Sequence, residues 1–201
     1  MRLILGSASP RRRDLLAQIG VVPSAILPAN IDETPHPREL PRPYVQRMAE
    51  QKCTACLTAM QSDPGDGETL VLTADTVVSA GRRILGKPEG ADEARAFLTL
   101  LGGRRHRVTT SVCLWGGGGL HARTIETRVK MKRLSHTEIE AYLASGEWQG
   151  KAGGYAIQGI ASAFVPEIIG SYTNVVGLPL TETAALLIGA GFPVSFKGDA
   201  A

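Results

Sequence analysis

Hydroxyl groups and positive charges are concentrated in residues 5–16, LGSASPRRRDLL, where an apolar strand-like start gives way to a helical pattern. A proline suits the first position of a helix and a serine suits the cap, so we expect a helix beginning at Pro10 with Ser9 as its N-cap. The free N–H groups at a helix start attract anions, whereas the helix dipole disfavours cations there. Arginines in this turn therefore predict a bound phosphate, with four candidate ligands: Ser7, Ser9, Arg11 and Arg12.

Two lysines further along the chain are candidates for the same anion site. Lys52 falls on the apolar face of a predicted helix, at i+4 from Met48. A lysine on a core face either has a partner or extends its charged end to solvent, and the helical pattern favours neither. Lys87 follows in a Gly-Lys-Pro sequence, and we count both lysines as candidate phosphate ligands.

Two carboxylates accompany this positive charge. Glu33 lies in a proline-rich loop over residues 30–43. Asp75 ends an apolar strand, which is where α/β proteins place site residues, and the alternative is a turn or cap aspartate. Carboxylates beside a phosphate would repel it unless a divalent cation bridges them, and Mg²⁺ prefers one or two carboxylates together with phosphate oxygens. We therefore expect Mg²⁺ beside Glu33 and Asp75.

Such a site suits the cleavage of a phosphoanhydride by water. The cation would polarise the phosphoryl group, and the positive side chains would stabilise charge on the departing pyrophosphate. Neither the Walker A pattern nor Gly-x-Gly-x-x-Gly after a strand occurs, which argues against a P-loop ATPase and a dinucleotide-binding protein. Cys53 and Cys56 form a C-x-x-C pattern, but it falls inside a predicted helix and no second Cys/His pair stands near to complete a zinc site. We therefore expect all three cysteines, Cys113 included, to be buried without a redox role.

The elements that must position these groups alternate between helices and strands. Apolar periodicity and capping residues predict helices over 10–19, 44–60, 92–101, 136–144 and 179–191. Strands are expected over 3–5, 69–78, 105–115 and 121–134, with a polar loop at 61–68, a hairpin turn at 80–81 and a glycine turn at 116–119. A β-rich middle between helices predicts a mixed α/β architecture.

The composition is that of an ordinary globular chain, because 43% of its 201 residues are hydrophobic and 20% are charged. A formal charge of +3 does not indicate nucleic-acid binding, and the basic run at 104–107 is interpreted as a solvated strand surface in preference to a binding patch. No apolar run reaches the ~18 residues of a membrane span, and the N-terminal apolar stretch is too short for a signal peptide. We therefore expect a cytoplasmic protein with no nucleic-acid or membrane partner.

The motifs occur in an order that resembles the Maf family of nucleoside triphosphate pyrophosphatases. After SASPRRRDLL come IDETP at 31–35, AEQK ending at Lys52, TADTVV at 73–78 and GKP at 86–88. GKAGGYAIQG and GSYTNVVGLPLTET follow, so that the resemblance extends to about residue 190. Each motif alone is weakly specific, but their combination in this order is highly specific.

The resemblance implies a two-lobed α/β fold, in which helices flank a long, twisted mixed sheet, related in shape to the inosine-triphosphate pyrophosphatases. It implies one domain over residues 1–192 with a cleft between the lobes, and we expect residues 193–201 to form a flexible tail. It further implies a homodimer that hydrolyses a nucleoside triphosphate to the monophosphate and pyrophosphate with Mg²⁺ or Mn²⁺.

The family motifs also imply roles for individual positions. Asp75 falls on the position of the general base that activates water and also touches the metal. Glu33 falls on an acidic position that the family links to metal or water. Lys87 falls on the position of a lysine that lies in the family's cleft. Triphosphate contacts are implied for four residues: Ser7, Arg11, Arg12 and Lys52.

Three positions favour the branch of the family that resembles dTTP/UTP pyrophosphatases. Arg11, Thr76 and Gln158 stand where the branch acting on 7-methyl-GTP carries Trp, Gln and Glu. The amide of Gln158 offers a donor and an acceptor to a pyrimidine edge. Lys151 and Tyr155 lie nearby in the sequence, with no role assigned to them.

Two other functions stay open at this point. The chain could hydrolyse 7-methyl-GTP or inosine triphosphate, although Thr76 and Gln158 argue against this specificity. It could instead bind nucleotide as a regulator of septum formation and cell division, with little turnover. A panel of nucleotides decides between the substrates, and an Asp75→Asn variant separates binding from turnover.

Overall fold

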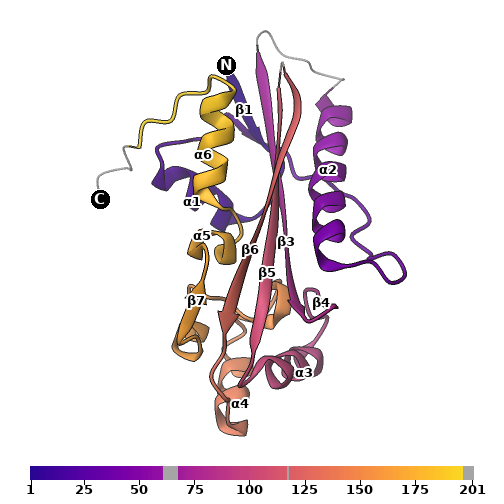
Figure 1. Cartoon of the computed structure of the whole chain (residues 1–201), viewed down its shortest axis with the longest axis vertical. Helices are drawn as coiled ribbons and strands as arrows, with labels where there is room; N and C mark the ends of the chain where they lie inside the picture. Colours follow the sequence, from indigo (N-terminus) through magenta and orange to yellow (C-terminus); the bar gives the residue numbers. More distant parts are fainter. Residues whose placement is uncertain (61–67, 117, 197–201) are drawn as a thin grey trace.

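The computed structural model describes residues 1–60, 68–116 and 118–196, and it shows a mixed β-sheet flanked by helices (Figure 1). The seven strands of the sheet follow the order β2-β1-β3-β5-β6-β7, with β4 paired to β3. Their bounds are β1 Arg2–Leu5, β2 Ala25–Ile26, β3 Thr69–Ala80, β4 Arg83–Leu85, β5 Arg105–Gly116, β6 Gly119–Lys130 and β7 Glu167–Ile169. The predicted α/β fold with a long mixed sheet is confirmed.

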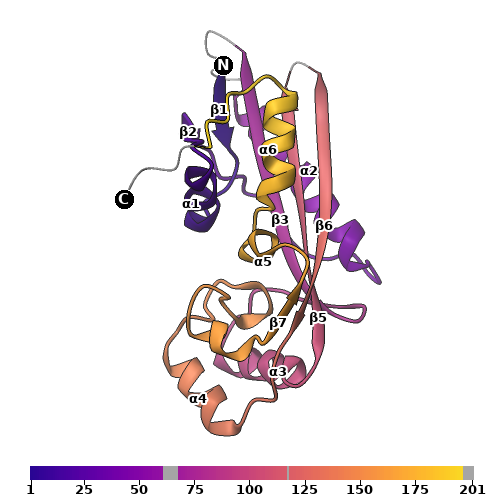
Figure 2. The ribbon, with the colours of Figure 1, turned by 60° about the vertical axis from the view of Figure 1, so that its left-hand side comes forward.

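Three strands of 12 residues each, β3, β5 and β6, run along the length of the molecule as a twisted antiparallel ribbon (Figures 1 and 2). On the other side of β3, the short strand β1 pairs in parallel with Thr69–Leu72. The hairpin strand β4 pairs with Val78–Ala80. Between these two partners, residues 73–77 of β3 have no neighbouring strand on this side among the described residues.

The helices cover both faces of the sheet. Their bounds are α1 Pro10–Gln18, α2 Pro41–Met60, α3 Ala91–Leu101, α4 His136–Ala144, α5 Tyr172–Val176 and α6 Leu180–Gly189, with short 3₁₀ turns η1 Ala152–Gly154 and η2 Ile160–Phe164. Helix α2 lies against one face, whereas α1, α5 and α6 lie on the other (Figure 1). Helices α3 and α4 pack together at the far end of the ribbon (Figure 2).

The central strands carry buried apolar residues on both faces because both faces are covered. On β1, Leu3 and Leu5 belong to the main core, whereas Ile4 packs with Cys53 and Cys56 of α2 on the opposite face. Strand β3 repeats this alternation, since its even-numbered apolar residues enter the main core and its odd-numbered ones face α2. The three cysteines are free and buried, as predicted.

Three local predictions need correction. Asp75 lies in the middle of β3 and does not end the strand, because the strand continues to Ala80 to pair with β4. Ser9 occupies the N-cap position, but its side chain makes no capping hydrogen bond. Helix α2 begins at Pro41, not at residue 44, and this is tolerated because a proline in the first turn lacks only an N–H that has no helical partner.

The end of the described chain returns to the core. Val194 packs against the main core, and the backbone N–H of Phe196 donates to the carbonyl of Ile19 at 3.2 Å. Residues 197–201 and most of the predicted loop at 61–68 lie outside the described residues, so the flexible tail stays a prediction. Within the described ranges, no helix combines the length and hydropathy that a bilayer crossing needs.

Candidate active site

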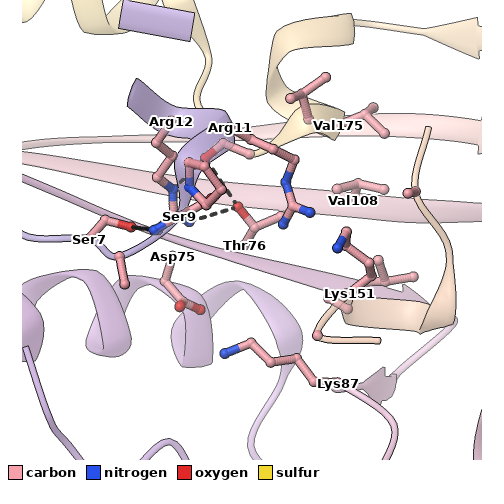
Figure 3. A pocket seen from close by; sticks show the side chains of 18 of the residues that line it. Ser7, Ser9, Arg11, Arg12, Asp75, Thr76, Lys87, Val108, Lys151 and Val175 are labelled. Carbon is pink, nitrogen blue, oxygen red and sulfur yellow. Dashed lines mark hydrogen bonds between the residues drawn. The ribbon is translucent and has the colours of Figure 1, made fainter. Parts of the chain in front are cut away.

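A cavity of about 430 Å³ opens at the uncovered edge of β3, between the end of β1 and the β3–β4 hairpin. Its walls come from α1, α2, the segment 149–158 and the end of α5 (Figure 3). All ten site residues that the sequence predicts line this cavity: Ser7, Ser9, Arg11, Arg12, Glu33, Lys52, Asp75, Thr76, Lys87 and Gln158. The structure therefore brings together groups that are up to 151 positions apart in the chain.

The turn from β1 into α1 depends on Gly6. Its N–H donates to the carbonyl of Leu72 at 2.8 Å, which continues the pairing of β1 with β3. A Cβ at this position would lie 2.5 Å from Cγ2 of Thr73 and 2.7 Å from Sγ of Cys56. Only a glycine lets the backbone pass between β3 and α2 without displacing them, and this passage delivers Ser7 and the start of α1 to the cavity.

Arg12 is buried and held by three neutral acceptors (Figure 3). Its Nε donates to the carbonyl of Gly177 at 2.9 Å, its Nη1 to Oγ of Ser7 at 2.9 Å and its Nη2 to Oγ1 of Thr76 at 3.3 Å. Burial lowers the pKa of Arg12, and the nearby charge of Asp75 opposes this effect. A guanidinium has five N–H donors, so two of them are left for an anion in the cavity.

The hydroxyl of Ser7 is oriented by the groups around it. Its Oγ accepts a hydrogen bond from Arg12 and a second one from the backbone N–H of Ser9 at 3.3 Å. Because a hydroxyl has two acceptor sites and one donor, the remaining capacity of Ser7 is its proton. Ser7 is thereby arranged to donate to a ligand, as a phosphate oxygen requires.

The two carboxylates share one ammonium group. Nζ of Lys52 lies 2.6 Å from Oδ1 of Asp75 and 2.7 Å from Oε1 of Glu33, and Nζ of Lys87 lies 3.1 Å from Oε2 of Glu33. We call these four residues the carboxylate end of the cavity. Lys52 is only 7% exposed, so of the two alternatives for this lysine the partnered one is confirmed. Burial raises the pKa of Glu33, but hydrogen bonds and charges from the two lysines outweigh it, and the net shift is downward.

Asp75 and Thr76 are consecutive on β3, so their side chains leave opposite faces of the sheet. Asp75 meets Lys52 on the face covered by α2, and Thr76 meets Arg12 on the face covered by α1 and α5. Both reach the cavity because, within the part of the chain that the structure describes, no strand covers the edge of β3 at this point. The bare edge therefore connects the carboxylates to the arginines.

Several contributors carried no usable sequence signal. Gly177 acts through a backbone carbonyl, which residue type does not reveal. Tyr155 lines the cavity, and its hydroxyl lies 2.7 Å from Nε2 of the buried His106. Burial lowers the pKa of His106 to about 4, so this member of the predicted basic run is a neutral core residue. Its neighbours Arg105 and Arg107 are exposed, as the prediction of a solvated strand surface requires.

The donor set at the carboxylate end fits a divalent cation. Oxygens of Asp75 and Glu33 already converge on one cationic centre, Nζ of Lys52, and carboxylate oxygens are the hard ligands that Mg²⁺ prefers. No group of three or more His, Cys, Asp or Glu side chains among the described residues could hold a metal. A cation here would thus need oxygens from a ligand, and Lys52 would have to move.

An α/β protein whose bare sheet edge brings paired carboxylates and arginines to one cavity has the groups that suit a polyphosphate ligand. Comparison with known families agrees, since the model of the family described as Maf-like protein matches residues 2–190. The chain belongs to the Maf family, and the predicted resemblance is confirmed.

Individual relatives are similar over almost their whole length. The chain is 61% identical over 194 residues to a protein of Cereibacter sphaeroides named dTTP/UTP pyrophosphatase, and the match covers 96% of this chain and 97% of that protein. Proteins with the same name from Ruegeria sp. and Mesorhizobium japonicum are 57% and 54% identical over 194 residues. These matches cover 96% of this chain and 97% and 93% of the two relatives.

Proposed function

We propose that this protein is a hydrolase that converts dTTP, UTP and modified pyrimidine triphosphates to the monophosphate and pyrophosphate. The observation that carries the proposal is the joint placement of Asp75, paired with Lys52, and Arg12, paired with Ser7, on one cavity. Membership of the Maf family and the activity for which the relatives are named support the same reaction.

In the proposed reaction, a general base lies on one side of the α-phosphorus and anion-binding side chains lie on the other. Asp75 accepts a proton from a water molecule as the water oxygen bonds to phosphorus. The bond from phosphorus to the bridging oxygen breaks, and its electron pair leaves with the pyrophosphate. Arg12 and Ser7 donate to the phosphate oxygens, and their fixed hydrogen bonds keep them in place before the substrate arrives.

Membership of this pyrophosphatase family implies a divalent cation, which we propose is Mg²⁺ or Mn²⁺ held by Glu33 and Asp75. When bound, it neutralises phosphate oxygens and favours deprotonation of water. With Glu33 and Asp75 holding a cation, the ammonium of Lys52 would be free to contact phosphate. Lys87 adds positive charge beside Glu33 at the rim, where it is largely exposed.

Selection of the pyrimidine is assigned to Gln158, and Thr76 is a second substrate contact in the same cavity. Gln158 lines the cavity and makes no hydrogen bond to another described residue, so its amide donor and acceptor are both available. A pyrimidine edge offers a matching acceptor and donor. Arg11 and Ser9 complete the set of proposed substrate contacts.

A panel of nucleoside triphosphates, assayed with Mg²⁺ and with a chelator, tests the proposal. We expect dTTP and UTP to give pyrophosphate and the monophosphate, and the chelator to stop the reaction. Release of orthophosphate would contradict the assigned bond, and faster hydrolysis of 7-methyl-GTP or inosine triphosphate would contradict the specificity. No turnover of any nucleotide, together with tight binding, would favour the regulatory role in cell division.

The assembly and the location of the protein stay predictions. A homodimer is expected from the family resemblance, and light scattering on the purified protein measures it. A cytoplasmic protein without nucleic-acid or membrane partners is expected from the composition. Cell fractionation checks the location.

A further inference from the structure

The positively charged side chains of the cavity differ in what they contact. Lys52 and Lys87 are ion-paired with carboxylates, and Arg12 is held by three neutral acceptors. Arg11, by contrast, makes no hydrogen bond or ion pair with another described residue. Among the described residues, Lys151 donates only to the backbone carbonyl of Gln149, at 3.1 Å. We call Arg11 and Lys151 the cationic end of the cavity.

The two groups of the cationic end lie in the same part of the cavity, beside Val108 and Val175 (Figure 3). Burial lowers the pKa of Arg11. Burial also lowers the pKa of Lys151, and the charge of Arg11 lowers it further, whereas the charge of Glu147 acts in the opposite direction. Two like charges that are partly buried side by side destabilise the empty cavity, and a multiply charged anion between them removes this cost.

The backbone around Lys151 is fixed to the sheet and to the neighbouring turn. Gly153 has a φ of 71° and donates its N–H to the carbonyl of Gly86 at 2.9 Å. A Cβ on Gly153 would lie 2.7 Å from Cγ1 of Val78, so a glycine is needed for this close approach. Because Gly86 precedes Lys87, the two lysine-bearing segments are tied to each other. Lys151 is therefore a positioned residue of the cavity wall.

We propose that Lys151, together with Arg11, forms the subsite for the two terminal phosphates of the nucleotide and hence for the pyrophosphate product. The inference rests on the proposed hydrolysis. The terminal phosphates carry most of the negative charge of a triphosphate. The departing pyrophosphate gains further negative charge, because it keeps the electron pair of the broken bond. The cationic end has positive charge without a carboxylate contact, whereas the carboxylate end contains two negative groups.

Equilibrium binding of two probes, inorganic pyrophosphate and UMP, tests the subsite without turnover. Calorimetry on Lys151→Met should show pyrophosphate binding weakened about tenfold or more, as loss of a charge-assisted hydrogen bond predicts, with UMP binding within about twofold of the unchanged protein. Lys151→Arg should recover most of the pyrophosphate affinity. Arg13→Met is the matched control, since Arg13 is exposed on α1 and does not line the cavity.

The proposed subsite would be wrong if Lys151→Met weakened the binding of pyrophosphate and UMP equally. It would also be wrong if only UMP binding weakened, or if neither affinity changed. If Lys151→Met does not fold, Arg11→Met on a separate helix gives the same measurement, with the same selective loss required. The nucleotide panel keeps the two proposals distinguishable. Selective loss of pyrophosphate in a protein that hydrolyses no nucleotide would leave the anion subsite standing and remove the proposed function.

Discussion

At the carboxylate end of the cavity, Lys52 bridges Asp75 and Glu33 at 2.6 and 2.7 Å, whereas at the cationic end Arg11 and Lys151 have no carboxylate contact among the described residues. The first arrangement balances its charges within the protein, so it is stable without a ligand. The second has no ion pair, although the charge of Glu147 acts on Lys151 from a distance, and it becomes more stable when an anion binds. The difference separates the place proposed for proton transfer from the place proposed for holding the leaving group.

The largest expected effect at the carboxylate end comes from Asp75→Asn. An amide cannot accept the proton from water, so kcat should fall about 10³-fold, within the usual range for loss of a general base. Nucleotide binding should be retained, because the change removes a negative charge near the phosphates. Steady-state kinetics and calorimetry measure the two effects. Asp14→Asn on the exposed side of α1 is the control, and an unchanged kcat in Asp75→Asn would exclude Asp75 as the base.

The stability of the protein at low pH tests the contact between His106 and Tyr155, a residue of the cavity wall. The pKa of His106 is about 4 in the folded protein, below its ordinary value of ~6.5, because of burial. The unfolded chain therefore binds this proton first, and stability is lost as pH falls from ~6.5 toward 4. The expected loss at pH 4.5 is about 2.5 kcal/mol of unfolding free energy.

Urea unfolding at pH 7 and pH 4.5 measures this loss. In His106→Gln the loss of stability on acidification should be smaller by about that amount. His136→Gln provides the control, because His136 is exposed on the surface of α4. The same acid-induced loss in His106→Gln and in the unchanged protein would show that His106 does not resist protonation.

Lys52→Met should leave the carboxylate oxygens of Glu33 and Asp75 free to bind a metal cation. The Lys52 ammonium competes for the same oxygens, and its charge-assisted hydrogen bonds are each worth about 1.5–3 kcal/mol, so its removal should tighten Mn²⁺ binding at least about tenfold. The signal of free Mn²⁺ in electron paramagnetic resonance measures binding without nucleotide. Unchanged or weaker binding of Mn²⁺ would contradict the assignment of Glu33 and Asp75 as metal ligands.

The smallest effect is expected for Lys87→Met. The side chain of Lys87 is 59% exposed, and an ion pair this accessible to water contributes about 0–1 kcal/mol. KM should rise by less than about fivefold with kcat little changed, and the difference should shrink at high salt. Kinetics at two ionic strengths check this. A loss comparable to that of Asp75→Asn would show that Lys87 belongs to the reaction centre itself.

Local patterns were enough to predict the elements and the membership of the site. Apolar periodicity placed the long helix α2 and the strands β3, β5 and β6 to within a few residues. The Ser135–Glu138 capping box is present as the residue types indicate, because both of its bonds lie within one turn. The order of motifs was enough to identify the cavity residues, although not their contacts.

The amino-acid sequence by itself determined what depends on neighbours along the chain: the strand–turn–helix start, the buried cysteines and the supply of cations and carboxylates. Tertiary structure alone decided where β1 ends and β4 begins against β3, and hence that Asp75 meets the cavity from mid-strand. It also decided that Lys52 bridges two carboxylates and that Gly177 anchors Arg12. These contacts depend on sheet register and on backbone carbonyls that every residue carries, so residue types along the chain do not specify them.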